Sequence, residues 1–218
     1  ITTSSDNTAV GHEALTNASS GQGNTAIGKA TMTAVVTGSN NTAVGIYALN
    51  ANTSASNNVA VGVNALVANT TGASNAAVGG EALAANTTAS YNTALGMNAM
   101  TANTTGVSNT AVGHNALKAN TTGNYSVAVG ELALQANTTG QNVAIGQAAM
   151  IANTTGTGNV SIGTYDDNGL QPLKANTTGD HHIAIGTGAL SANTTADNNT
   201  AVGYQALTAN TTGTANVA

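Results

Sequence analysis

The chain has 218 residues, 41% of them hydrophobic, with no Cys, Trp or Phe, and three basic against eight acidic residues give it a net charge of −5. Only 5% of the residues are charged, against about 25% in a typical soluble domain. This composition argues against disorder, which combines high charge with few aliphatic residues, against nucleic-acid binding, which needs basic patches, and against disulfides or thiolate metal sites.

One 17-residue repeat recurs along the chain. Counted from its leading Asn, it reads N-T/V-A-V-G in slots 1 to 5, A-L-x-A in slots 8 to 11 and N-T-T-G in slots 12 to 15. Complete repeats start at residues 7, 24, 41, 58, 75, 92, 109, 126, 142, 159, 182 and 199, and residues 216–218 open another. A fixed short period is the signature of a solenoid whose repeats stack as rungs. We therefore expect residues 1–218 to form a single repeat array.

Two segments of each repeat alternate as β-strands do. Residues 58–62 (NVAVG), 159–163 (NVSIG) and 182–186 (HIAIG) have β-branched residues in both slot 2 and slot 4, which is the period of a strand. Slots 9 and 11 continue the alternation with Leu or Met followed by Ala, and the variable slot 10 between them should face water. We predict an all-β, parallel β-solenoid (β-roll) of about twelve 17-residue rungs, each with two short strands and two turns. A helical repeat is disfavoured because every repeat has an interior Gly and an Asn-Thr-Thr run.

Glycine occupies slot 5 in every complete repeat. This indicates a corner where φ is positive or where the backbone lies too close to a neighbour for a Cβ atom. The corner glycines are Gly11, Gly28, Gly45, Gly62, Gly79, Gly96, Gly113, Gly130, Gly146, Gly163, Gly186 and Gly203. The NTTG segment has turn chemistry. All five Tyr lie in slots 6, 7 or 17, beside the turns, so we expect a narrow core that holds no ring.

Two irregularities interrupt the period. The repeat that starts at residue 126 is one residue short, and the repeat that starts at residue 159 has a six-residue insertion at about residues 166–171. Carboxylate and imidazole groups gather in and after this insertion: Asp166, Asp167, Asp180, His181 and His182. Such groups are weak candidate cation ligands, but their spacing matches no known metal loop. We expect a solvated turn with no metal and no cofactor, and a protruding loop that suits a specific contact.

In ten of the twelve complete repeats, slot 12 is an Asn that starts an N-x-T/S sequon. The same Asn and the Thr that follow it suit ladders in which identical side chains of successive rungs hydrogen-bond to one another. We favour such a ladder over glycosylation. The Asn residues are Asn52, Asn69, Asn86, Asn103, Asn120, Asn137, Asn153, Asn176, Asn193 and Asn210.

Small residues in slots 3 and 8 suggest contacts between chains. If slots 2 and 4 face the core, slot 3 faces outward, yet it is Ala everywhere except Ser161, and slot 8 is Ala everywhere except Thr31 and Pro172. Burial within one isolated rung does not clearly offset the entropy lost when its residues are ordered. We therefore expect the Ala faces to pack against sister chains, with three solenoids around one axis.

The repeat resembles a known family. Residues 58–72 (NVAVGVNALVANTTG) and 126–140 (SVAVGELALQANTTG) resemble the head repeats of trimeric autotransporter adhesins, and are similar to NTAVGYQAL repeats in phage-tail-fibre-like proteins that end in an endosialidase-type chaperone. The resemblance covers nearly the whole chain and is most specific in slots 1 to 5, although this repeat is longer than the usual head repeat. It implies a left-handed parallel β-roll that forms a homotrimer at the cell surface or outside the cell.

The sequence favours a structural role over catalysis. Its Ser, His and Asp residues are scattered without catalytic spacing, and no apolar run reaches the roughly 18 residues of a membrane span. We expect a non-enzymatic structural or adhesive segment of an extracellular fibre, whose partners are copies of itself and a host surface or matrix ligand. The alternatives are a phage-type tail fibre shaft on a virion, a self-assembling filament and, from another class, an ice-binding β-solenoid. Against ice binding, the adjacent Thr of slots 13 and 14 should point to different sides.

Overall fold

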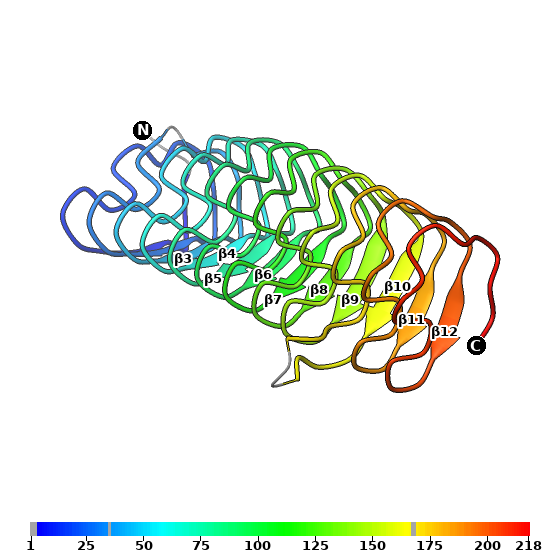
Figure 1. Cartoon of the computed structure of the whole chain (residues 1–218). Helices are drawn as coiled ribbons and strands as arrows, with labels where there is room; N and C mark the ends of the chain where they lie inside the picture. The colour runs from blue at the N-terminus through cyan, green and yellow to red at the C-terminus, as the bar shows by residue number, and fades with distance from the viewer. Residues whose placement is uncertain (1–3, 35, 167–168) are drawn as a thin grey trace. The chain divides into compact units, whose positions relative to one another are not determined.

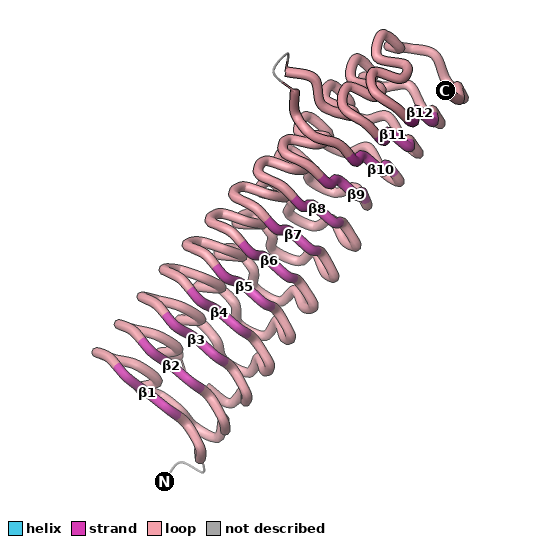
Figure 2. The backbone as a smooth tube through the Cα atoms, turned by 90° about the horizontal axis from the view of Figure 1, so that it is seen from below, coloured by secondary structure: helices cyan, strands magenta, loops and turns pink. Residues whose placement is uncertain are grey.

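The computed structural model describes residues 4–34, 36–166 and 169–218. It confirms the predicted fold class: the described chain is all-β, with twelve short parallel strands arranged as a β-solenoid and no helix (Figures 1 and 2). The chain forms two compact units, an N-terminal unit (Ile1–Ser108) and a C-terminal unit (Asn109–Ala218).

Every rung contributes one strand to the sheet of its unit. The N-terminal unit contains β1 (Thr8–Val10), β2 (Thr25–Ile27), β3 (Thr42–Val44), β4 (Val59–Val61), β5 (Ala76–Val78) and β6 (Thr93–Leu95). The C-terminal unit contains β7 (Thr110–Val112), β8 (Val127–Val129), β9 (Asn142–Ile145), β10 (Asn159–Ile162), β11 (Ile183–Ile185) and β12 (Thr200–Val202). Within each unit, strands pair in parallel and in sequence order. Equivalent slots lie side by side, as Ala43 and Ala60 do, so like residues stack on like.

The prediction of a second strand in each rung is wrong. In the rung that starts at residue 58, slots 5 to 12 form successive tight turns, in which Ala65 N donates to Gly62 O at 3.4 Å and Asn69 N donates to Leu66 O at 3.1 Å. Between these turns, Leu66 N donates to Ala82 O of the next rung at 3.0 Å. The segment therefore divides its hydrogen bonds between its own rung and the neighbouring rung, and no continuous strand ladder forms (Figure 2).

Left-handed backbone in slot 9 explains the residue type found there. Every slot 9 residue has φ between 48° and 52°, a region in which a β-branched residue is a genuine outlier. Slot 9 is accordingly Leu or Met in all twelve complete repeats and never Val, Ile or Thr. Since strands favour β-branched residues, this absence is the sequence signal that slots 8 to 11 form a turn.

The corner glycines of slot 5 are required both by a positive φ and by a close backbone contact with the next rung. Their φ values lie between 118° and 140° except at Gly163, which precedes the insertion. A Cβ atom on Gly62 would lie 2.5 Å from the carbonyl oxygen of Gly79 in the next rung. The corner therefore brings successive backbones into close contact, and this allows the flat stacking of the rungs.

The prediction that slots 2 and 4 face the core is wrong, and so is the prediction that Ala faces pack between chains. Ala60 in slot 3 and Ala65 in slot 8 are both 0% exposed within the chain itself, whereas Val10 and Leu95 in slot 4 are 57% and 48% exposed. The reason is space: Leu or Met of slot 9 and the Asn side chains of slots 1 and 12 fill the interior, which leaves room only for a methyl group opposite them. The large β-branched side chains therefore point outward.

Two other surface predictions are confirmed. The side chains of slot 10 are exposed or half-buried in every rung except at Ser191. All five Tyr are exposed, from 41% for Tyr47 to 68% for Tyr91. The aromatic rings of these Tyr therefore take no part in the core.

Leu66→Ile tests the left-handed turn. Ile has nearly the volume of Leu but is β-branched, so at a φ of 51° it should lower the free energy of unfolding by about 1–3 kcal/mol. Leu66→Met should cost less than about 1.5 kcal/mol, because Met32 and Met100 occupy the same slot with the same backbone. Urea unfolding followed by circular dichroism measures both variants. Equal losses for Ile and Met would contradict a backbone origin.

Candidate functional site

A column of buried amides runs through each unit at slot 12. In the N-terminal unit, Asn86 Nδ2 donates to Asn69 Oδ1 of the preceding rung at 2.8 Å and to Ala89 O of its own rung at 3.0 Å. Asn103 Nδ2 donates to Asn86 Oδ1 at 3.0 Å. These Asn side chains are 0% exposed, and buried amides are tolerated only when they are hydrogen-bonded. In the N-terminal unit these bonds tie the rungs that start at residues 58, 75 and 92 to one another in one register.

A second column stands at slot 1. Asn58 N donates to Asn41 Oδ1 of the preceding rung at 3.0 Å, and Asn58 Nδ2 donates to Gly72 O at 2.9 Å. The same pattern recurs in the next rung, where Asn75 N donates to Asn58 Oδ1 at 2.9 Å. The side-chain oxygen in slot 1 therefore accepts from the first backbone N–H of each following rung.

The slot 12 sequons lie in this buried column. All ten Asn side chains named above are buried except Asn210, which is half-buried. A glycan on Nδ2 would remove a donor from the column and would need space that the close-packed core lacks. The folded chain is therefore incompatible with glycans at the nine buried positions.

His182 takes the place of Asn in slot 1, and the prediction that the core holds no ring is wrong at this position. The side chain is 0% exposed. Its backbone N donates to Asn159 Oδ1 at 2.9 Å, and its Nδ1 accepts from Asn199 N at 3.2 Å. His182 Nδ1 therefore accepts the same hydrogen bond that the side-chain oxygen of Asn accepts in other rungs. This requires a neutral ring whose proton is assigned to Nε2, next to the carbonyl of Ala196.

Burial lowers the pKa of His182 below its usual value of 6.5, because desolvation disfavours the imidazolium. The hydrogen bond with the backbone of Ala196 and the carboxylates of Asp197 and Asp180 oppose this shift without cancelling it. Because the pKa is lower in the folded chain, the unfolded chain takes up a proton first as the pH falls below 6.5. The stability of the C-terminal unit is therefore full above that pH and decreases below it.

The insertion is held by its own hydrogen bonds. Asp166 Oδ1 accepts from Leu170 N at 2.8 Å, and Lys174 Nζ donates to Gly169 O at 2.9 Å. Asp167, the second acidic candidate, lies outside the described residues. Asp166 therefore stabilises a turn within its loop.

The three candidates after the insertion point in different directions. Asp180 Oδ1 accepts from Thr157 N of the preceding rung at 2.6 Å. His181 is exposed in slot 17 while His182 is buried in the core. In the part of the chain that the structure describes, no three His, Asp or Glu side chains are grouped closely enough to hold a metal ion.

The outer sheet face, defined as the side chains of slots 2 and 4 on β1–β6 and on β7–β12, is an exposed, largely apolar surface of each unit. None of these side chains is buried and none is charged. In the N-terminal unit Val59 is 40% and Leu95 is 48% exposed, and in the C-terminal unit Ile183 is 41% and Ile185 is 37% exposed. Six of the slot 2 residues are Thr: Thr8, Thr25, Thr42, Thr93, Thr110 and Thr200. Each unit thus presents neutral, regularly spaced methyl and hydroxyl groups.

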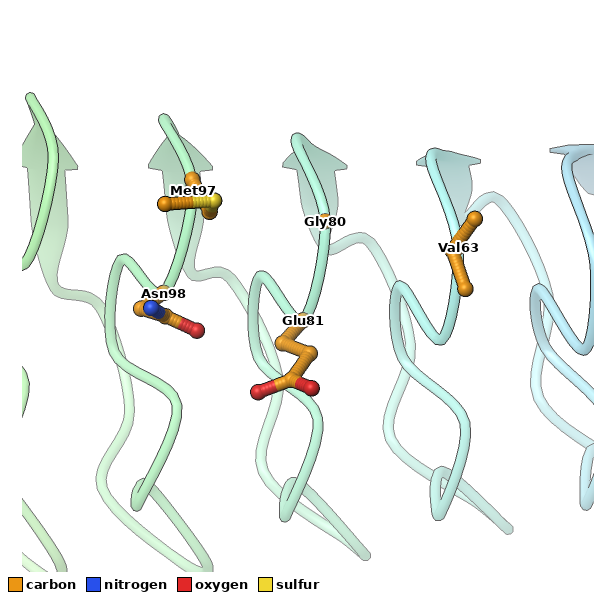
Figure 3. A pocket seen from close by; sticks show the side chains of 5 residues that line it. All are labelled: Val63, Gly80, Glu81, Met97 and Asn98. Atoms are coloured by element: carbon orange, nitrogen blue, oxygen red, sulfur yellow. The ribbon is translucent and has the colours of Figure 1, made fainter.

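A recess of about 240 Å³ lies in slots 6 and 7 of the N-terminal unit. It exists because Gly80 has no side chain between Val63 and Met97 of the adjacent rungs, as Figure 3 shows. Glu81 and Asn98 complete its lining. Glu81 is the one titratable group among these five residues, so the recess lacks the paired nucleophile and base that catalysis needs.

A second recess, of about 170 Å³, lies in the C-terminal unit where one residue is missing from the repeat. Gln141 O accepts from Gly158 N at 2.7 Å. In a complete repeat the same bond joins slot 17 to slot 16 of the preceding rung, as from Asn57 N to Ser39 O at 3.0 Å. Gln141 therefore occupies slot 16, and the missing residue is slot 17. The recess is lined by Tyr125, Gln141, Asn142, Val143, Gly158, Asn159 and Val160.

Comparisons of the chain with protein-family models, with curated proteins and with solved structures found no match. The resemblance to adhesin head repeats therefore stays a prediction from the repeat itself. Among the described residues, no helix has the length and apolar character needed to cross a membrane.

His182→Asn tests the pH dependence. The substitution restores the residue that slot 1 has in most repeats, so the loss of stability below pH 6.5 should shrink or disappear. His181→Asn is the matched control, because His181 is exposed and its left-handed φ of 57° suits Asn. Thermal unfolding between pH 4.5 and 8 measures both variants. An unchanged pH profile in His182→Asn would show that His182 is not the responsible group.

Proposed function

We propose that this chain is a non-enzymatic structural and adhesive segment of an extracellular fibre, in which copies of the chain associate through the outer sheet face. The observation that carries the proposal is the chemistry of this face, since its side chains are uncharged and none of them is buried. Each rung places its slot 2 and slot 4 side chains on this face, so the face is a regular feature of the repeat. The area of a contact through this face therefore increases with every added rung.

The size of the face supports association. Three strand residues span about 10 Å and six strands span about 29 Å, so each unit offers roughly 300 Å². The largest apolar patch on a typical monomer is about 300–600 Å² and is often functional. A patch of this size without charges offers no like-charge repulsion against a second copy of the chain.

Three copies arranged in parallel around one axis would cover these faces, since a closed symmetric assembly leaves no apolar face unpaired. A homotrimer is also what the resemblance to adhesin head repeats implies. The contact would consist of the β-branched and Thr side chains of slots 2 and 4, while the Ala residues of slots 3 and 8 stay inside each chain.

The surface outside this face suits a spacer that carries a binding tip or presents a long repetitive surface. Only 5% of the residues are charged and 2% are aromatic, so few anchors of the kind that dominate protein interfaces are available. A virion tail fibre shaft or a self-assembling filament would use the same contact.

A charged substitution on the outer sheet face tests the proposal. Val61→Lys with Val78→Lys places cations on two neighbouring, half-buried positions of the face, where like charges would meet across the contact at a cost of several kcal/mol. The wild-type chain should have the mass of a trimer by light scattering, and the variant the mass of a monomer with an unchanged circular dichroism spectrum.

The matched control is Thr71→Lys with Thr88→Lys, which adds the same charge at exposed positions of slot 14. This control should remain trimeric. A monomeric wild-type chain at high concentration, or equal dissociation of both variants, would remove the association through slots 2 and 4.

Ice binding is a second candidate, and one observation favours it. Slots 2 and 4 lie about 6.6 Å apart along a strand and neighbouring rungs about 4.8 Å apart, so the outer sheet face is a regular lattice of the kind that binding to an ordered ice surface requires. Thr25 and Thr42 are adjacent in this lattice. The Thr of slot 13 are less suitable, because Thr70 Oγ1 already donates to Thr87 O at 3.0 Å.

Thermal hysteresis of the purified chain tests this candidate. If the face binds ice, the wild-type chain should be monomeric and should depress the freezing point, and Val61→Lys with Val78→Lys should abolish the effect while the slot 14 control keeps it. A trimeric wild-type chain without hysteresis would exclude ice binding by this face and support the fibre segment.

A further inference from the structure

We propose that the recess beside Tyr125 binds one uncharged sugar ring. The recess arises from two departures from the repeat in adjacent rungs. Slot 17 is missing after Gln141, and slot 17 of the next rung is Gly158, which has no side chain. Together they leave two successive rungs without a slot 17 side chain, whereas the other rungs of the C-terminal unit carry one there.

The walls of the gap are an aromatic ring and small apolar groups. Tyr125, in slot 17 of the preceding rung, is 61% exposed and lines the recess on one side. Val143 and Val160, both half-buried in slot 2, line it as well. The ring of His181 limits the gap beyond Gly158, since a Cβ atom on Gly158 would lie 2.8 Å from His181 Cδ2. The lining of the gap is therefore largely apolar.

The polar group at the recess is a free carboxamide. Gln141 is exposed, and among the described residues none hydrogen-bonds to its side chain, while its backbone oxygen is taken by Gly158 N. A carboxamide offers two donor hydrogens and one acceptor oxygen, which match the hydroxyl groups of a sugar. The amides of Asn142 and Asn159 are already used in the core, as Asn159 Nδ2 donates to Gly179 O at 2.9 Å.

These groups select the ligand class. The apolar C–H face of a pyranose ring can stack on the Tyr125 ring and the Val methyl groups, while Gln141 pairs with hydroxyls at the edge. The lining includes no charged side chain, so a neutral hexose is favoured over a sialic or uronic acid. The volume of about 170 Å³ is below the roughly 300–1,000 Å³ of pockets for drug-sized ligands. One ring with weak, millimolar affinity is the expected occupant.

Saturation-transfer NMR on the full chain tests the site. The probes are glucose, galactose, mannose and N-acetylglucosamine, with glucuronic acid and N-acetylneuraminic acid as charged comparisons. At least one neutral sugar should bind, and Tyr125→Asn should weaken that binding at least about tenfold. Asn is compatible with this position, because Asn40, Asn57 and Asn198 occupy slot 17 with φ between 60° and 62°.

Two further variants distinguish binding in the recess from binding to an exposed Tyr ring alone. Tyr91→Asn removes an equally exposed Tyr from slot 17 of the N-terminal unit, where the following repeat has its full 17 residues, and should leave binding unchanged. Insertion of one Asn between Gln141 and Asn142 restores slot 17 and should abolish binding with an unchanged circular dichroism spectrum.

The proposal is overturned if no neutral sugar binds at about 100 mM, well above the expected affinity, if only the acidic sugars bind, or if binding persists in both Tyr125→Asn and the insertion variant. Light scattering on the same samples gives the oligomeric mass separately. A failed sugar site is therefore distinguishable from a failed fibre contact.

Discussion

The hydrogen-bonded stacking of identical amides is the constraint on which the rest of the fold depends. Asn58 and Asn75 in slot 1, and Asn69 and Asn86 in slot 12, are fully or almost fully buried and find partners in the neighbouring rungs. An isolated rung would leave these groups unpaired in an apolar interior, which costs about 1–3 kcal/mol for each group. Register is therefore specified by polar pairing, and a repeat shifted by one residue would break both columns at once.

The same columns decide which residues face outward. Because Asn and a Leu or Met from slot 9 fill the narrow interior, slots 3 and 8 hold only Ala, and the larger residues of slots 2 and 4 turn to the surface. The large residues of each strand thus face the solvent and its Ala faces the core, whereas the large residues of an ordinary half-buried strand face the core. An exposed, uncharged sheet face is the direct result. Association through that face, as proposed for a fibre segment, uses a surface that the core could not accommodate.

The period of the repeat was sufficient to predict the solenoid, the parallel pairing and the register, because stacking of like on like is a property of the repeat as a whole. The two strands per rung were wrong because alternation alone does not separate a strand from a chain of left-handed turns. The lack of β-branched residues in slot 9 carried that information. The orientation was wrong for a related reason: the Ala that fills slot 3 in every repeat except at Ser161 suggests a contact between chains, although it marks the core. His182 was aligned with Asn in slot 1, but the equivalence of Nδ1 to an amide oxygen needs the hydrogen bonds to be seen.

In such an array, we expect specific binding at rungs whose outward-facing residues differ from those of the regular repeat. A change in an interior slot disturbs the contacts with both neighbouring rungs, and His182 is accommodated because its neutral ring reproduces the bonds of Asn. A change in an outward slot leaves the columns intact. The two recesses follow this pattern, since Gly80 removes a side chain from slot 6, and the deletion after Gln141 with Gly158 removes two from slot 17. The regular rungs act as a scaffold, and the absence of side chains at a few outward positions creates shapes that no regular rung provides.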